Sequence, residues 1–334
     1  MTNLVEVTRE SVVESIHSGS VAVVSLEGKM VAHVGDPDWV TFARSSAKPV
    51  QAIPLVESGA LAAFSLEEAD LALFCASHSS ELQHTDRVTR ILEILGLDES
   101  YLQCGGHLPH SMETYDRLVM AGLHPTSLYS NCSGKHTGML AYCKHVGVDV
   151  NTYHKPDHPL QRRILSTLAE LAEVPEEKIQ LATDGCGVPT FALPMRNWAL
   201  TIAKFAEPGD EPHAQAMAQI SAAMRQYPEL VAGTGRFDTQ LMRVTQGRLL
   251  IKSGAEGFAL MADTENRLGL AVKVMDGNGR AVPPVVMETL RQLHLLHVKE
   301  MDQLKEFWQP IIYNTRQEQV GEILVNFNLT ENRT

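Results

Sequence analysis

The chain has 334 residues, of which 44% are hydrophobic and 20% are charged, as in ordinary globular proteins. Lys and Arg number 28 against 40 Asp and Glu, and the formal net charge of −12 argues against nucleic acids and anionic membranes as partners. Five cysteines are an odd number in a long chain, which favours reduced, buried thiols or ligands over a disulfide framework. The N-terminus has no signal-peptide pattern, and the apolar runs are too short for a membrane span, so we expect a cytoplasmic protein.

Strand patterns lie near both ends of the chain, and helical patterns lie between them. Two apolar runs around a Glu27-Gly28 turn predict a hairpin over Val21–Val34. Apolar periodicity then predicts three helices, over Thr85–Leu95, His158–Glu173 and Ala214–Arg225. The remaining predicted elements are strands at Leu249–Lys252, Gly257–Met261 and Leu268–Val274, a helix over roughly Pro283–Val298, and a strand over Val320–Phe327.

This order of elements predicts an α+β fold with one antiparallel sheet. The sheet joins the N- and C-terminal strands, and the central helical block lies beside it. No linker divides the chain, so we expect a single catalytic domain over residues 1–334. Its sheet region comprises about 1–45 and 245–334, and its helical region about 46–244.

A serine and a lysine at helical spacing are the first candidate catalytic pair. Ser45 and Lys48 are three residues apart, so a helix that begins at Ser45 places both side chains on one face. A lysine can activate a serine nucleophile if burial or a nearby positive charge, such as Arg44, lowers its pKa. The alternative is a serine that caps a helix, followed by a surface lysine.

A second motif makes the catalytic interpretation more credible. Lys252-Ser253-Gly254 ends a predicted strand in the second half of the chain. Ser-x-x-Lys opening a helix, together with Lys-Thr/Ser-Gly on a strand, is the pattern of serine β-lactamases and penicillin-binding proteins. Between the two motifs, the serine-rich segment Cys75–Glu81 offers a second hydroxyl. Its pattern does not decide between Ser77, Ser79 and Ser80, and a polar turn is the alternative.

Two later segments combine cysteines with polar side chains. Cys132, Lys135 and His136 precede a helical run, and Asp184 and Cys186 lie in a glycine-rich loop. Two thiolates and a nitrogen ligand would suit Zn²⁺ with an open fourth position. The alternative is that the cysteines are small buried hydrophobic side chains.

Five motifs in this order resemble those of the rhizobial-type L-asparaginases, the asparaginase II or class 3 family, which have a serine-β-lactamase-like fold. The motifs are Arg44–Pro49, Ala76–Ser79, Asn131–His136, Asp184–Gly187 and Lys252–Gly257.

The resemblance implies hydrolysis of L-asparagine to L-aspartate and ammonia by a homodimeric enzyme. Ser45 would be the nucleophile and Lys48 its base, while Ser77 would pair with a further lysine, Lys252 or, failing that, Lys273. The other implied roles are a zinc site at Cys132, Lys135 and Cys186, and substrate contacts at Arg44, His136 and Asp184.

Two other functions stay open. One is a serine hydrolase of the same fold that acts on glutamine, a β-lactam or a small peptide. The other is a non-catalytic protein that binds zinc or an amino acid, in which Ser45 only caps a helix.

Overall fold

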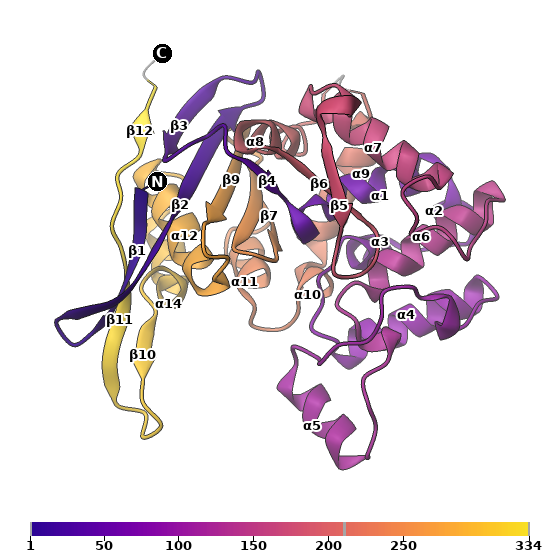
Figure 1. Cartoon of the computed structure of the whole chain (residues 1–334), viewed down its shortest axis with the longest axis horizontal. Helices are drawn as coiled ribbons and strands as arrows, with labels where there is room; N and C mark the ends of the chain where they lie inside the picture. Colours follow the sequence, from indigo (N-terminus) through magenta and orange to yellow (C-terminus); the bar gives the residue numbers. More distant parts are fainter. Residues whose placement is uncertain (1, 210–211, 333–334) are drawn as a thin grey trace. The chain divides into compact units, whose positions relative to one another are not determined.

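The computed structural model describes residues 2–209 and 212–332, which form two compact units. The chain passes from one unit to the other four times, after Ser46, Ala192, Glu207 and Thr239 (Figure 1). Unit 1 comprises Met1–Ser46, Leu193–Glu207 and Gln240–Thr334, and unit 2 comprises Ala47–Ala192 and Pro208–Thr239.

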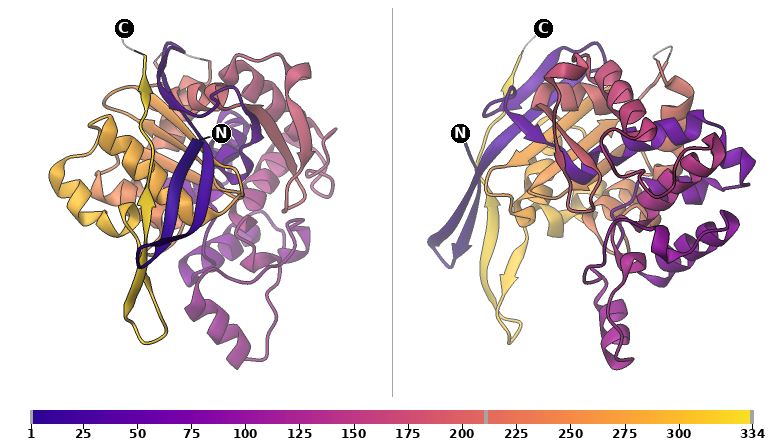
Figure 2. Two further views of the ribbon diagram at one scale, coloured as in Figure 1. Left: turned by 60° about the vertical axis from the view of Figure 1, so that its left-hand side comes forward. Right: turned by 45° about the vertical axis from the view of Figure 1, so that its right-hand side comes forward.

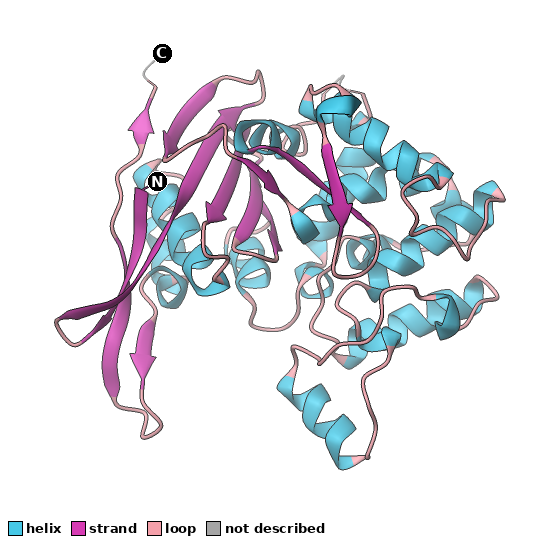
Figure 3. Cartoon of the chain, viewed as in Figure 1, coloured by secondary structure: helices cyan, strands magenta, loops and turns pink. Residues whose placement is uncertain are grey.

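An antiparallel nine-stranded sheet is the centre of unit 1 (Figure 3). The strand order is β10-β11-β1-β2-β9-β8-β7, and β3 pairs with both β2 and β12. The strands of unit 1 are β1 (Thr2–Arg9), β2 (Val12–Ser25), β3 (Met30–Val34), β4 (Val40–Phe42), β7 (Leu249–Gly254), β8 (Phe258–Asp263), β9 (Leu268–Val274), β10 (Ile311–Tyr313), β11 (Gln319–Val325) and β12 (Thr330–Glu331).

Helices cover both faces of this sheet. Residues Val21–Val24 of β2 are buried in succession, which requires apolar neighbours on each side because successive side chains point to opposite faces. α8 packs on β2, β8 and β9, and α12 packs on β1, β9 and β11 from the other side (Figure 2). The helices of unit 1 are η1 (Arg44–Ala47), which leads into unit 2, α8 (Met195–Ala203), α11 (Phe237–Val244), which begins in unit 2, η5 (Gly279–Ala281), α12 (Val282–Gln292), α13 (Val298–Gln303) and α14 (Lys305–Trp308).

Unit 2 is mainly helical, and α6 is its central helix. α6 packs on α1, α2, α3, α4 and α7, and its first nine residues are all buried. The helices of unit 2 are α1 (Lys48–Glu57), α2 (Ala60–Ala63), α3 (Glu68–Phe74), α4 (Leu82–Ile94), η2 (Glu99–Tyr101), α5 (Met112–Met120), η3 (Ser127–Tyr129), α6 (Ser133–Val146), α7 (Pro159–Ala172), η4 (Glu176–Lys178), α9 (Ala214–Gln226) and α10 (Pro228–Val231), and the hairpin strands are β5 (Gln180–Thr183) and β6 (Pro189–Pro194).

Two glycines allow α6 and α3 to approach closely. A Cβ at Gly134 would lie 2.4 Å from the carbonyl oxygen of Leu73, and one at Gly138 would lie 2.8 Å from Cγ of Phe74. The two glycines are four residues apart, so they lie on the same face of α6. The close packing therefore fixes the start of α6 against the end of α3.

The predicted α+β arrangement is confirmed, because terminal strands form one antiparallel sheet and the middle of the chain is mainly helical. The predicted helix over Pro283–Val298 was too long. α12 ends at Gln292, and His294 adopts a left-handed φ of +56°, which terminates a helix. Residues 193–207, which the sequence pattern grouped with the helical region, belong to unit 1 because α8 packs on the sheet. Among the described residues, no helix is long and apolar enough to cross a membrane.

We expect Gly134→Ala to destabilise the protein by about 1–3 kcal/mol, because the added methyl group would overlap a backbone oxygen of α3. Denaturant unfolding followed by circular dichroism measures the change. Gly279→Ala is the control, since a Cβ at Gly279 meets no atom within 4 Å. Equal unfolding midpoints for the two variants would contradict the packing argument.

Candidate active site

Ser45 lies in η1, which continues directly into α1 at Lys48. Side chains three residues apart eclipse in a 3₁₀ turn, so this local geometry keeps the predicted one-sided spacing of Ser45 and Lys48. Arg44 opens the turn with a left-handed φ of +51°, which costs a non-glycine residue about 1–3 kcal/mol. Strained backbone of this kind clusters at functional sites.

The end of β7 packs against the segment that bears Ser45. A Cβ at Gly254 would lie 2.6 Å from the carbonyl oxygen of Ala43 and 2.8 Å from Oγ of Ser46. A glycine is therefore needed at this position of the Lys252-Ser253-Gly254 motif. The structure thus brings the Lys-Ser-Gly motif beside the Ser45 segment within unit 1.

The two lysines proposed to pair with Ser77 both belong to unit 1. Lys252 is buried, and its Nζ donates to the carbonyl oxygen of Ser253 at 2.6 Å. Lys273 donates to two backbone carbonyl oxygens, each at 2.6 Å, and burial lowers the pKa of its amine. Ser77 belongs to unit 2, so the choice between Lys252 and Lys273 stays a prediction.

The Lys48 side chain is almost fully buried, with only 1% of the residue exposed. Its Nζ donates to the carbonyl oxygen of Ala76 and, at 2.9 Å, to Oγ of Ser77. A buried amine requires such partners, because removing it from water without them costs several kcal/mol. Lys48 therefore fixes the hydroxyl of Ser77 within unit 2.

Hydrogen bonding distinguishes the three serines that the sequence pattern left open. The hydroxyls of Ser79 and Ser80 donate to backbone carbonyl oxygens, at 3.0 and 2.7 Å. The hydroxyl of Ser77 instead accepts from Lys48. Of the three, Ser77 alone contacts a lysine among the described residues.

His78 links the Ser77 loop to the start of α6. Its backbone N–H donates to the carbonyl oxygen of Asn131 at 3.2 Å, and its Nδ1 accepts from the N–H of Ser80 at 3.1 Å. Burial holds the pKa of His78 well below its usual value, so the ring is neutral. Nε2 then carries the proton and donates it to Oγ of Ser133, 2.9 Å away.

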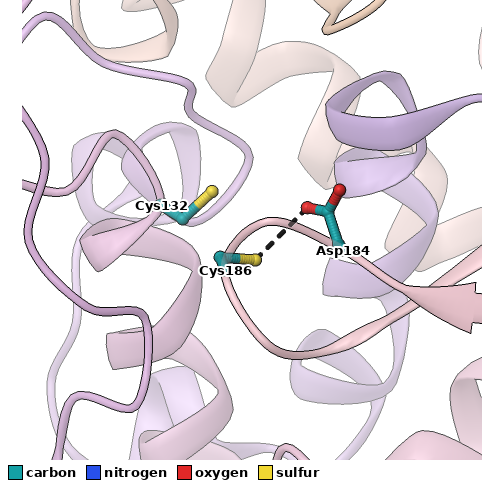
Figure 4. A group of neighbouring side chains, drawn as sticks. All are labelled: Cys132, Asp184 and Cys186. Atoms are coloured by element: carbon teal, nitrogen blue, oxygen red, sulfur yellow. Dashed lines mark hydrogen bonds between the residues drawn. The ribbon is translucent and has the colours of Figure 1, made fainter.

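The predicted cysteine and lysine ligands meet at one place. Cys132 is the N-cap residue of α6, Lys135 lies in its first turn, and Cys186 lies in the turn between β5 and β6. Lys135 Nζ is 2.9 Å from Sγ of Cys186. Figure 4 shows the carboxylate of Asp184 and the two thiols turned toward one another, and their ligand atoms all lie within 4.8 Å of each other.

The two thiols of this cluster ionise differently. A hydrogen bond from Cys132, aided by the charge of Lys135, lowers the pKa of Cys186 to about 6. The same hydrogen bond, together with burial, raises the pKa of Cys132 to about 12. Burial acts to lower the pKa of the Lys135 amine. The neighbouring groups, above all the sulfur of Cys186, together outweigh burial and raise this pKa. Cys186 is therefore the first thiol of the metal-free cluster to lose its proton, and in the structure it donates that proton to the carboxylate of Asp184 at 3.3 Å.

His136 is fully buried and has one ring nitrogen without a partner. Nδ1 lies 2.7 Å from Oη of Tyr153, which also accepts from the N–H of Gln103 at 2.9 Å. Burial and the charge of Lys135 keep the pKa of His136 well below its usual value. Nε2 has no hydrogen-bond partner among the residues that the structure describes. A buried polar atom of this kind is suited to a ligand.

Sequence reasoning missed three features of the site. Tyr153 orients His136, yet it lies in an irregular segment without a recognisable motif. Asp184 was interpreted only as a substrate contact, although its carboxylate lies among the thiols. Arg236 donates to the carbonyl oxygen of Ser77 at 3.0 Å across 159 positions of sequence, a separation that no local pattern reveals.

The sequence pattern of the family described as L-asparaginase II matches residues 5–325. The chain belongs to the L-asparaginase II family. Comparison with curated proteins gave no match.

Solved structures with a similar chain course have low sequence identity to this asparaginase II family member. The protein Mglu in its native form is 13% identical with a TM-score of 0.46, covering 84% of this chain and 65% of its own, so this chain spans about two thirds of Mglu. A β-lactamase from Mycobacterium bovis is 15% identical with a TM-score of 0.42, covering 82% and 94%. The Bacillus subtilis glutaminase YbgJ, bound covalently to 5-oxo-L-norleucine, is 14% identical with a TM-score of 0.38, covering 84% and 89%.

We expect the metal-free protein to show a thiolate absorbance step near 240 nm with a midpoint at about pH 6. The step should vanish in Cys186→Ser and persist in Cys143→Ser, because burial raises the pKa of Cys143 to about 12. The folded pKa of Cys186 is depressed, so its thiolate adds stability that is complete above the ordinary pKa and is lost as pH falls through about 6. A midpoint near the ordinary pKa of cysteine would contradict the assignment.

Proposed function

We propose that this protein is an amidohydrolase, and specifically an L-asparaginase that hydrolyses L-asparagine to L-aspartate and ammonia, with Ser45 as nucleophile. The observation that carries the proposal is the buried Lys48 amine, bonded to Ser77 Oγ and three residues after Ser45. An ordinary helix-capping serine with a surface lysine would have left the amine in water. Family membership supports an amide substrate.

Lys48 is suited to act as the base that takes the proton of Ser45. A neutral amine has two N–H groups, and Lys48 has two hydrogen-bond acceptors, the carbonyl oxygen of Ala76 and Oγ of Ser77. Its lone pair is then left for the proton of the nucleophile. Ser45 Oγ forms a bond to the side-chain amide carbon, and the C–N bond breaks as the nitrogen receives a proton.

The Ser77 hydroxyl is positioned to deliver that proton, since it accepts from Lys48 and has its own hydrogen to give. As that hydrogen passes to the nitrogen, the Lys48 ammonium returns the proton taken from Ser45 to Ser77 Oγ, which leaves Lys48 neutral for the second half of the reaction. Ammonia leaves, and an acyl ester on Ser45 remains. Water then hydrolyses the ester, with Lys48 again serving as base. Lys252, or alternatively Lys273, would support Ser77 as the second lysine of the pair.

The amino-acid end of the substrate needs one cation for its carboxylate and acceptors for its ammonium. Arg44 supplies a guanidinium next to the nucleophile, and Asp184 supplies a carboxylate. His136 offers the unpartnered, neutral Nε2 inside the protein. These three residues are therefore our proposed substrate contacts.

The cysteine cluster fits a zinc ion. It offers two sulfur donors and the nitrogen of Lys135, which leaves a fourth position open. The carboxylate of Asp184, which we assign to the substrate, lies within 4.8 Å of both thiols. A bound Zn²⁺ would supply a local positive charge that keeps Cys132 and Cys186 as thiolates and Lys135 as a neutral amine. Cys132, Lys135 and Cys186 would then hold two loops at the substrate end. A homodimer is our further expectation for the assembly.

Ser45→Ala should reduce ammonia release from L-asparagine to less than about one hundredth of wild type, because the acyl ester can no longer form. Ser58→Ala, at the far end of the same helical segment, is the control. Residual activity of Ser45→Ala above about one hundredth of wild type would reject the nucleophile. A panel of L-glutamine, a fluorescent penicillin and small peptides tests whether the protein is another hydrolase of this fold. If the wild-type protein releases no ammonia from L-asparagine, the result favours a non-catalytic binding protein.

Replacing Cys186 by Ser should mainly raise the KM for L-asparagine, because the cluster orients the substrate and does not take part in the bond changes. Steady-state kinetics with and without a chelator, together with metal analysis of the purified protein, measure this. Cys143→Ser is the matched control, since Cys143 is buried in α6 but lies outside the metal-ligand group. A loss confined to kcat would instead place the metal in the chemistry.

A further inference from the structure

Unit 2 contains a cavity of about 760 Å³ that involves none of the residues assigned above to catalysis or metal binding. This volume lies within the range of small-molecule sites. The walls come from the end of the Ser77 loop, the start of α4, the start of α5 and the loop after α10. The charged lining residues are Glu81, Glu113, Arg117 and Arg236, and Thr234 lies beside them.

The wall of this cavity has charges of both signs that do not neutralise each other. Glu113, Arg117 and Arg236 form no ion pair with any residue in the described part of the chain. Glu81 is charged, because hydrogen bonds from Thr234 and Gln83 outweigh its burial and lower its pKa. Opposite charges that face one space without pairing are suited to a ligand with both an anionic and a cationic group.

Two helices begin at the cavity, and a side chain caps each of them. α4 starts after its N-cap residue Glu81, and α5 starts after its N-cap residue Ser111. A helix N-terminus favours an anion because its first backbone N–H groups lack partners within the helix. The Glu81 carboxylate already caps α4, and Ser111 Oγ already accepts from the N–H of Thr114 in α5. The groups that favour a carboxylate in the cavity are therefore the guanidinium groups of Arg117 and Arg236.

Arg236 is held ready for this role by the fold. One guanidinium nitrogen donates to the carbonyl oxygen of Ser77 at 3.0 Å, and the guanidinium makes no other hydrogen bond to the described residues. Its remaining N–H groups are therefore available to a ligand. The loop that precedes Arg236 is itself fixed, because Thr234 donates to Glu81 through its backbone N–H at 2.7 Å and its hydroxyl at 3.0 Å.

We propose that this cavity is a second binding site, for a free α-amino acid in its zwitterionic form. Arg117 and Arg236 hold its carboxylate, and Glu113, with Glu81 behind it, holds its ammonium. Arg236, which holds the ligand, also donates a hydrogen bond to the carbonyl oxygen of Ser77. The site is separate from the cysteine cluster and from His136, where we place the amino-acid end of the catalytic substrate.

Hydrogen exchange measured by mass spectrometry tests the site with L-aspartate, which has no side-chain amide to hydrolyse. We expect L-aspartate to slow exchange in peptides covering 81–83 and 110–117 of the full-length protein. The Glu113→Gln/Arg117→Gln variant should lose this protection. Glu93→Gln/Lys144→Gln, which makes the same charge changes at exposed positions elsewhere in unit 2, should keep it. Succinate, which lacks the ammonium group, should require at least about ten times the concentration for the same protection.

Three outcomes would overturn the proposal. They are unchanged exchange of 110–117 at the solubility limit of L-aspartate, equal protection in the Glu113→Gln/Arg117→Gln variant, and equal potency of succinate. Peptides covering 184–188 report separately on the proposed catalytic site. Protection of 184–188 alone would reject the second site and leave the asparaginase proposal intact. Protection of 110–117 alone would support the second site and count against the proposed catalytic site. Circular dichroism of each variant checks that a loss of protection is not a loss of folding.

Discussion

The buried amines of Lys48 and Lys135 impose the constraint on which the rest of unit 2 depends. Each lysine exposes only a few per cent of its surface, and an ammonium or amine without partners in such a place would cost several kcal/mol. Lys48 is satisfied by an oxygen of Ala76 and the hydroxyl of Ser77. Lys135 is satisfied by the sulfur of Cys186. Both solutions require segments far apart in sequence to meet at α1 and α6.

The two lysine environments are parts of one hydrogen-bonded network. His78, next to Ser77, bonds through its backbone to Asn131 and through its ring to Ser133, so it brackets the cap residue Cys132. Gly134, in the first turn of α6, packs directly against α3, the helix that ends at Phe74. A change at the cysteine cluster therefore reaches the Ser77 loop through rigid, buried contacts. This coupling would let the proposed zinc site influence substrate affinity without touching the reacting bond.

Most of the secondary structure could be predicted, because local rules set it. The hairpin at Val21–Val34 and the strands of β7, β8 and β9 follow from apolar runs and turn residues, and α7 and α9 follow from apolar periodicity. The prediction was wrong where a single residue interrupts a periodic pattern, as His294 does by adopting a left-handed conformation. The packing of α8 is a different matter, because only the sheet under this helix determines that it belongs to unit 1.

The sequence by itself determined which chemical groups this protein has and how they are ordered: Ser45 and Lys48 at helical spacing, a strand-borne Lys252, and cysteines beside Lys135 and in a glycine-rich turn. Motifs of this kind are local, so residue type and spacing are enough to find them. Only the tertiary structure decided that Ser77, and not Ser79 or Ser80, accepts from Lys48, that Asp184 lies with the thiols, and that Tyr153 and Arg236 contact His136 and Ser77. These pairings join residues up to 159 positions apart. They are selected by burial and by the need of buried polar groups for hydrogen-bond partners, and the spacing of residues along the sequence does not record either.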